Sequence, residues 1–258
     1  MNINIDGYNI NYVDEGQTNS DYAILLLHGW GASINYFAKT VNLLKEKYRV
    51  LALDLPGFGK SDNLKKSFFV DDYVDIVIDF LKKLNVKKVS LIGHSYGGRI
   101  IIKLNNRDVK DFEIINNVLI DAAGIKNKIG FKKRIKIYIY KIIKSLIALL
   151  PIGNKKYEMI ENLKSKFGSK DYKSVKKELR DTLVKSVNED LSSILKNIKV
   201  DTLIIWGEKD IDTPIDNAKF MEREIKNSGL VVIKNTGHFS FIEDEYTFLK
   251  VMASYFNI

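Results

Sequence analysis

Short, continuously apolar runs recur along this 258-residue chain, and stretches with helical spacing separate most of them. Such uninterrupted runs are typical of strands that are covered on both faces, whereas apolar residues three and four positions apart indicate a helix. Alternation of the two predicts an α/β fold, with a mostly parallel sheet of about eight strands and helices on both faces. The apolar runs lie at 23–27, 50–53, 89–92, 118–120, 203–206 and 230–233, and the clearest helical spacing lies at 35–48 and 70–84.

The first fourteen residues alternate polar and apolar side chains on either side of Asp6-Gly7. An Asp-Gly pair between two such runs is a hairpin signal, so a hairpin should begin the sheet. The segment lacks the basic-then-apolar layout of a signal peptide, and no stretch reaches the roughly 20 apolar residues of a membrane span. We therefore expect a globular, cytoplasmic protein. Because cysteine is absent, disulfides, thiolate metal ligands and a cysteine nucleophile are excluded.

Residues 125–200 interrupt the alternation. They show no strand signal but contain amphipathic runs at 131–150 and 170–187, so we expect a helical cap inserted into a core made of 1–124 and 201–258. The segment holds 20 Lys and Arg against 7 Asp and Glu, a net charge of +13, and the rest of the chain carries −4. This charge indicates either a solvated helical surface or a weak contact with an anionic membrane surface. Nucleic-acid binding is not expected, because no nucleic-acid module or interleaved aromatic platform is present.

One turn in the chain carries a pattern of reactive chemistry. Gly93-His94-Ser95-Tyr96-Gly97 lies between the 89–92 strand and a helix expected to start with 99–104, and it fits G-x-S-x-G. Glycines permit a turn that is too tight for side chains, and such a turn pushes the serine hydroxyl out of the backbone. Ser95 is therefore the candidate nucleophile.

A serine nucleophile needs a general base, and the chain has three histidines. His94 adjoins Ser95, so its side chain should point away from the serine's side of the turn, and we expect a structural role. His28 ends a strand in His28-Gly29-Trp30-Gly31 and should order that loop. His238 follows the last strand, in Gly237-His238-Phe239, and an ordinary pKa near 6.5 suits a proton shuttle. His238 is thus the candidate base.

Two carboxylates follow strands and could orient the base. Asp210 comes after the 203–206 strand in a Gly-containing loop, precedes Asp212-Thr213-Pro214 at a helix start, and completes the order Ser, Asp, His. Asp121 comes directly after the 118–120 strand. Loop carboxylates often serve only as caps or turn formers. We favour Asp210 as the acid and keep Asp121 as the alternative.

Acyl transfer also requires donors for a developing oxyanion. The backbone N–H of Tyr96, at the amino end of the helix after Ser95, can supply one donor. The backbone N–H of Trp30 can supply the other, because Gly29 and Gly31 keep its loop slim enough to approach a substrate. Trp30 and Tyr96 are therefore the expected oxyanion hole.

Taken together, these segments resemble the α/β-hydrolase fold family, in the capped branch that includes small serine esterases, carbon-carbon bond hydrolases, epoxide hydrolases and haloalkane dehalogenases. The resemblance implies that Ser95 attacks, His238 shuttles the proton, Asp210 orients it, and Trp30 with Tyr96 holds the oxyanion, with no cofactor or metal. It covers nearly the whole chain and rests on four segments: His28-Gly29-Trp30-Gly31; Asp54-Leu55-Pro56-Gly57-Phe58-Gly59-Lys60-Ser61-Asp62; Gly93-His94-Ser95-Tyr96-Gly97-Gly98; and Trp206-Gly207-Glu208-Lys209-Asp210 with Gly237-His238-Phe239.

Departures within the family narrow the expected reaction. Epoxide hydrolases and dehalogenases of this branch use an aspartate nucleophile, whereas this chain has Ser95. Carbon-carbon bond hydrolases usually carry Asn before the serine and Trp after the histidine, and this chain has His94 and Phe239 at those positions. We therefore expect a serine esterase, in the carboxylic ester hydrolase class EC 3.1.1. It would cleave small or medium carboxylic esters, or a related anionic apolar substrate, through an acyl-enzyme.

Two other functions stay open. The first is a carbon-carbon bond hydrolase or lyase that acts on a carboxylate-bearing substrate, because Arg99 matches an Arg implicated in contacting the substrate carboxylate in the menaquinone-pathway lyases of this fold. Arg99 could instead form an ion pair on its helix. The second is a ligand-binding signalling protein without catalysis. Trp30, Arg99 and Phe239 are the candidate substrate-binding residues, and no obligate protein partner is evident.

Overall fold

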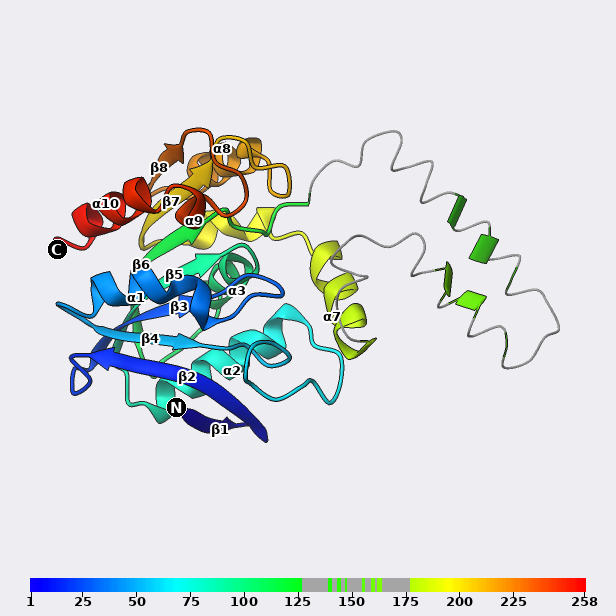
Figure 1. Ribbon diagram of the computed structural model, residues 1–258, viewed down its shortest axis with the longest axis horizontal. Helices are drawn as coiled ribbons and strands as arrows, with labels where there is room; N and C mark the ends of the chain where they lie inside the picture. The colour runs from blue at the N-terminus through cyan, green and yellow to red at the C-terminus, as the bar shows by residue number, and fades with distance from the viewer. Residues whose placement is uncertain are drawn as a thin grey trace.

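The computed structural model describes residues 1–126 and 177–258, with isolated positions between them (Figure 1). One eight-stranded sheet in the order β1-β2-β4-β3-β5-β6-β7-β8 forms its centre. β1 and β2 are antiparallel, β2 is antiparallel to β4, and every other pair is parallel, which confirms the predicted α/β class. The strands are β1 Asn2–Ile5, β2 Tyr8–Gly16, β3 Tyr22–Leu27, β4 Arg49–Leu53, β5 Lys88–His94, β6 Glu113–Ile120, β7 Asp201–Gly207 and β8 Ser228–Ile233.

The hairpin predicted at the start of the chain is present. Ile5 pairs with Tyr8, so Asp6 and Gly7 form a two-residue turn. Both have positive φ, 48° and 75°, as the mirror-image turns of tight hairpins require.

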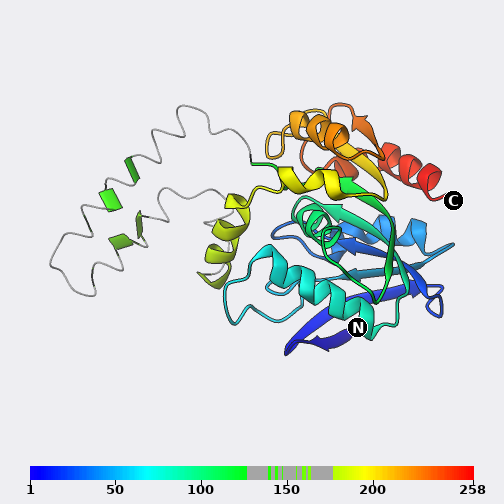
Figure 2. The same cartoon turned by 180° about the vertical axis from the view of Figure 1, so that it is seen from behind.

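Helices cover both faces of the sheet (Figures 1 and 2). One buried cluster joins strand residues to α1 Ala38–Leu44, α9 Ser240–Glu243 and α10 Glu245–Tyr255. The other joins the opposite face to α2 Val70–Lys83, α3 Tyr96–Leu104 and α8 Ile215–Glu224. Because neighbouring residues of a strand point to opposite faces, the continuous apolar runs supply both clusters.

Several element boundaries differ from those expected, three of them in ways that bear on the site or the core. The 35–48 helix is divided into a 3₁₀ turn, η1 Ile34–Phe37, and α1. α3 begins at Tyr96 rather than 99, because Ser95 itself is its N-cap. β6 begins at Glu113 rather than 118, because polar residues interrupt the apolar pattern in its first half. One of them, Asn117, is buried and donates to Thr202 Oγ1 at 3.2 Å and to Asn105 Oδ1 at 3.3 Å. The local sequence does not reveal these partners.

The segment 125–200 joins β6 to β7. The helix expected over 131–150, with its membrane contact, lies outside the described residues apart from isolated positions, so the cap and its boundaries remain a prediction. The 170–187 helix is described from 177 as α7 Lys177–Asn188, and η2 Ser192–Asn197 follows it. In the part of the chain that the structure describes, no helix is long and apolar enough to cross a membrane.

α7 is fixed to the core by polar contacts. The Thr182 hydroxyl accepts a hydrogen bond from the Phe68 backbone N–H at 2.9 Å. The Lys185 ammonium donates to Ser67 Oγ at 2.7 Å and lies 4.1 Å from the centre of the Phe69 ring. These contacts attach the helix that precedes β7 to the loop that precedes α2.

Candidate active site

Ser95 lies in a strained turn between β5 and α3. Its φ of 49° and ψ of −105° are unusual for a residue with a side chain, and such strain often accompanies function. The turn is compact because Gly97 lies against β3: a Cβ on Gly97 would come within 2.0 Å of the Leu27 carbonyl oxygen. Ser95 is half-buried and caps the amino end of α3, where the helix dipole favours negative charge.

The carboxyl ends of β5, β7 and β8 bring three predicted residues together. His238 Nε2 lies 2.9 Å from Ser95 Oγ, and His238 Nδ1 lies 2.8 Å from Asp210 Oδ2. A carboxylate oxygen only accepts, so Nδ1 carries the hydrogen and Nε2 presents its lone pair to the serine hydroxyl. This arrangement can take a proton from Ser95 as its oxygen attacks.

The charges at this site favour an ionised Asp210 beside a basic His238. Burial alone would raise the pKa of Asp210, but hydrogen bonds from His238 and Thr213 lower it below its ordinary value. Burial alone would lower the pKa of His238, but the hydrogen bond and charge of Asp210 raise it. The shifts have opposite signs because each group stabilises the other's charged form.

The two residues expected to form an oxyanion hole, Trp30 and Tyr96, pack against each other. Within residues 1–126 and 177–258, neither the Trp30 nor the Tyr96 backbone N–H has a protein acceptor. The indole of Trp30 meets the ring of Tyr96 edge-to-face at 5.2 Å, and the ring of Phe58 at 4.9 Å on another side. This packing joins the loop that carries Trp30 to the amino end of α3.

The hydrogen bonds of the Asp121 carboxylate go to residues other than His238. One of its carboxylate oxygens accepts from the Gly207 N–H at 2.7 Å, and the other accepts from the Ser240 N–H and hydroxyl. It thus ties the end of β6 to the end of β7 and to the start of α9. Burial raises the pKa of Asp121 to about 7, even though its hydrogen bonds oppose the shift.

His28 orders its loop from inside the core. Its Nδ1 donates to the Gly29 carbonyl at 2.7 Å, and its Nε2 accepts from the Leu55 N–H at 3.0 Å. The neighbouring Asp54 accepts from the Ile34 N–H at 2.8 Å and from the Lys60 N–H at 2.8 Å. The Asp54–Asp62 segment therefore supports the loop that carries Trp30, and the Asp54 carboxylate also accepts from the side-chain amide of Asn11 at 2.8 Å.

Comparison with known proteins assigns this arrangement to a family. The chain is 30% identical over 255 residues to the AB hydrolase superfamily protein YisY of Bacillus subtilis (strain 168), with 91% of each protein covered. This chain belongs to the α/β hydrolase family. A family model described as the α/β hydrolase fold matches residues 22–104, and one described as TAP-like protein matches residues 180–257.

Other relatives of this α/β hydrolase are named esterases. The pimeloyl-[acyl-carrier protein] methyl ester esterase of Legionella pneumophila (strain Corby) is 24% identical, with 99% of both chains covered. The solved structure of the esterase EaEST from Exiguobacterium antarcticum superposes with a TM-score of 0.74 at 26% identity, and the match covers 98% of this chain and 97% of that one.

The candidate substrate-binding residues of this hydrolase lie in different surroundings. Phe239 is partly exposed, 5.6 Å from the His238 ring and 5.9 Å from the ring of Tyr36. Arg99 is buried, and its Nη1 donates to the backbone carbonyl of Glu189 at 2.7 Å, just after α7. Its guanidinium therefore holds the segment that leads out of α7.

One supporting residue of the hydrolase was missed by the sequence analysis. The Thr213 hydroxyl donates to Asp210 Oδ2 at 2.6 Å, and the backbone N–H groups of Asp212 and Thr213 donate to Asp210 Oδ1 at 2.8 and 3.0 Å. An aspartate followed two and three residues later by such donors is typical of an Asx turn. That spacing was visible in Asp210-Ile211-Asp212-Thr213 and could have identified Thr213.

Proposed function

We propose that this hydrolase is a serine esterase that cleaves small or medium carboxylic esters through an acyl-enzyme. The observation that carries the proposal is the Ser95–His238–Asp210 chain of hydrogen bonds, with 2.9 and 2.8 Å between successive partners. The esterases among its relatives support the ester substrate. In this proposal Ser95 is the nucleophile, His238 the general base and Asp210 the acid that orients it.

The reaction follows from these positions. Ser95 Oγ forms a bond to the ester carbonyl carbon while His238 Nε2 accepts the hydroxyl proton. The carbonyl oxygen becomes an oxyanion, to which the backbone N–H groups of Trp30 and Tyr96 donate. As the tetrahedral intermediate collapses, the bond to the alkoxy group breaks and His238 returns the proton to the leaving alcohol. Water then attacks the acyl-enzyme by the same route and releases the carboxylic acid.

The decisive experiment tests whether Ser95 is an activated nucleophile. Hydrolysis of p-nitrophenyl esters of increasing chain length measures turnover and acyl preference, and a fluorophosphonate probe reports an activated serine. Ser95→Ala should abolish labelling and lower turnover by roughly a millionfold. Ser254→Ala, at an exposed position of α10, should leave both unchanged. Undiminished turnover by Ser95→Ala would refute the mechanism.

The alternatives have different outcomes in the same experiment. If the probe labels Ser95 but no ester is cleaved, a carbon-carbon bond hydrolase, a lyase or a ligand-binding signalling protein becomes the better explanation. Burial of Arg99 and its hydrogen bond to the Glu189 carbonyl weigh against a direct contact with a substrate carboxylate. This observation favours the ester substrate over the anionic one.

A further inference from the structure

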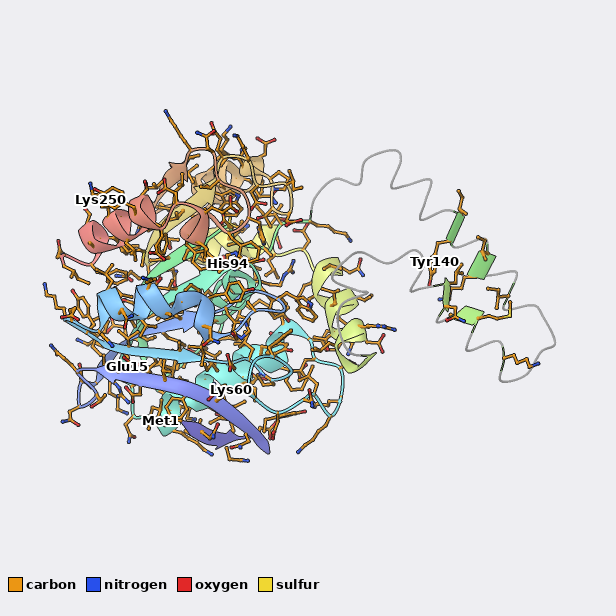
Figure 3. All side chains as sticks on the ribbon, viewed as in Figure 1. Met1, Glu15, Lys60, His94, Tyr140 and Lys250 are labelled. Atoms are coloured by element: carbon orange, nitrogen blue, oxygen red, sulfur yellow. The ribbon has the colours of Figure 1, made fainter. Side chains whose placement is uncertain are left out.

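His94, the residue before the proposed nucleophile, is buried at the carboxyl end of β5 (Figure 3). Its Nε2 lies 2.8 Å from the backbone carbonyl oxygen of His238. A carbonyl only accepts, so His94 carries its hydrogen on Nε2 and donates it. Burial and the neighbouring His238 lower the pKa of His94 to about 3, so the ring is neutral near neutral pH.

The ring of His94 also touches the loop that carries His238 and the loop that carries Trp30. Its centre lies 5.0 Å from the ring of His238 and 5.0 Å from that of Phe239. On the other loop, a Cβ on Gly29 would come within 2.6 Å of His94 Nδ1, so only glycine lets the ring pack against this backbone. Gly29 immediately precedes Trp30. One buried imidazole therefore contacts the loop of the proposed base and the loop of a proposed oxyanion donor.

Other groups hold the backbone on either side of His238 but not its own carbonyl. Glu243 accepts from the Gly237 N–H at 2.7 Å and from the Phe239 N–H at 3.3 Å, and Asp121 accepts from Ser240. Among the residues that the structure describes, His94 supplies the side-chain donor to the His238 carbonyl. Ser95 and His94 are consecutive, so one turn engages the base at two points.

We propose that His94 is a positioning residue: its Nε2–H holds the His238 backbone so that the imidazole stays between Ser95 and Asp210. The inference rests on the proposed function, in which His238 is the base. A misplacement of about 1 Å in a catalytic group can cost on the order of 100-fold in rate. His94 thus acts on the reaction through His238 and does not itself touch the substrate.

The test compares His94→Phe, which keeps a ring but loses the donor, with His94→Gln, which places an N–H donor at about the same reach. In the full-length protein, His94→Phe should lower kcat for the preferred p-nitrophenyl ester by roughly 10- to 100-fold, with KM changed by less than about twofold. His94→Gln should recover most of the loss. Equal kcat for wild type and His94→Phe would overturn the proposal, as would equal losses in the two variants.

A second readout does not depend on the ester substrate. The chain has only three histidines, so proton NMR can follow the titration of His238 directly. Its pKa is raised by Asp210, with smaller contributions from Asp121 and Asp212. In His94→Phe the pKa should fall toward the ordinary histidine value, because the ring is no longer held against Asp210, and His94→Gln should keep the wild-type value. An unchanged titration in His94→Phe would overturn the inference.

The two readouts separate this inference from the proposed function. If wild type neither cleaves esters nor reacts with the fluorophosphonate, the esterase proposal fails, and the NMR comparison still decides whether His94 positions His238. His94→Leu is a second variant without a donor, and it covers the case in which the phenyl ring prevents folding. Thermal unfolding of each variant distinguishes lost stability from a displaced base in a folded protein.

Discussion

Asp121 receives two hydrogen bonds from Ser240, from its backbone N–H at 3.1 Å and from its hydroxyl at 2.6 Å. Asp210, which follows the neighbouring strand, lies instead 2.8 Å from His238 Nδ1. The sequence left both carboxylates as candidates for the acid, but in the structure they have different partners. Asp121 holds the backbone that follows His238, whereas Asp210 holds the imidazole.

Replacing Asp210 with Asn should lower kcat/KM by roughly ten-thousandfold. Oδ1 of Asp210 accepts from the backbone N–H groups of Asp212 and Thr213, so an asparagine would keep its oxygen there and turn its NH₂ toward His238. His238 would then carry its hydrogen on Nε2 and could not take the proton of Ser95. Steady-state hydrolysis of the preferred ester measures the loss.

Asp121→Asn is the matched control for Asp210→Asn, and it should lower kcat/KM by only about tenfold or less. It should instead reduce the free energy of unfolding by about 1–3 kcal/mol, because an amide cannot accept all the hydrogen bonds from Gly207 and Ser240. If Asp121→Asn had the larger effect on kcat/KM, Asp121 would have to be reassigned as the acid.

The pH dependence of kcat/KM should show an acid limb set by His238. The base must be neutral to accept a proton, and its pKa is raised by Asp210, so activity should fall as the pH drops through a value above about 6.5. In Asp210→Asn the residual activity should have this limb at lower pH, because the stabilising charge is gone. Initial rates in buffers of constant ionic strength test the shift, and an identical limb in both proteins would contradict it.

Asp121 should also make stability depend on pH. Its pKa is about 7 in the folded protein against an ordinary value of 3.8, so between these values the folded state binds a proton that the unfolded state does not. Stability from this group therefore falls as the pH rises through that interval. Urea unfolding should show a greater loss from Asp121→Asn at about pH 5 than at about pH 8. A loss that grows with pH would contradict the raised pKa.

Local patterns in the sequence predicted the features that are decided by neighbouring residues. Asp6-Gly7 predicted the hairpin, because its backbone requirement is met within two residues. The strand before Ser95 and the helix after it were predicted from apolar runs, although α3 begins at the residue after Ser95. Ser95, Asp210 and His238 each follow a predicted strand, so the sequence also predicted that their side chains would meet, because the carboxyl ends of parallel strands lie at one edge of the sheet.

Contacts between distant segments were not predictable in the same way. Nothing near His94 indicates that its ring meets the carbonyl of His238, 144 residues away. The early start of β6 depends on Asn105 and Thr202, which satisfy the buried amide of Asn117. Such pairs depend on how elements pack, and a single sequence shows the residue types but not the partners.

Tyr96, whose backbone N–H is a proposed oxyanion donor, also contacts α7 through its side chain. Its phenol is buried 3.0 Å from Ser186 Oγ of α7, and the Ser186 hydroxyl donates to the Thr182 carbonyl at 2.8 Å. Since the serine has one hydrogen, the phenol must donate to it. Ser186→Ala would leave this buried donor unpaired, so we expect a loss of about 1–3 kcal/mol in the free energy of unfolding.

The same substitution should also affect catalysis, through Tyr96. A shift of its ring moves the first turn of α3, so Ser186→Ala should lower kcat by about tenfold. It should also weaken the binding of a boronic acid that mimics the tetrahedral intermediate more than it weakens the binding of the ester. Ser193→Ala, at an exposed position of η2, is the control. Combining Ser186→Ala with Tyr96→Phe removes donor and acceptor together, so the double variant should be more stable than the two single losses predict. Strict additivity would mean that the phenol and Ser186 are not coupled in the folded protein.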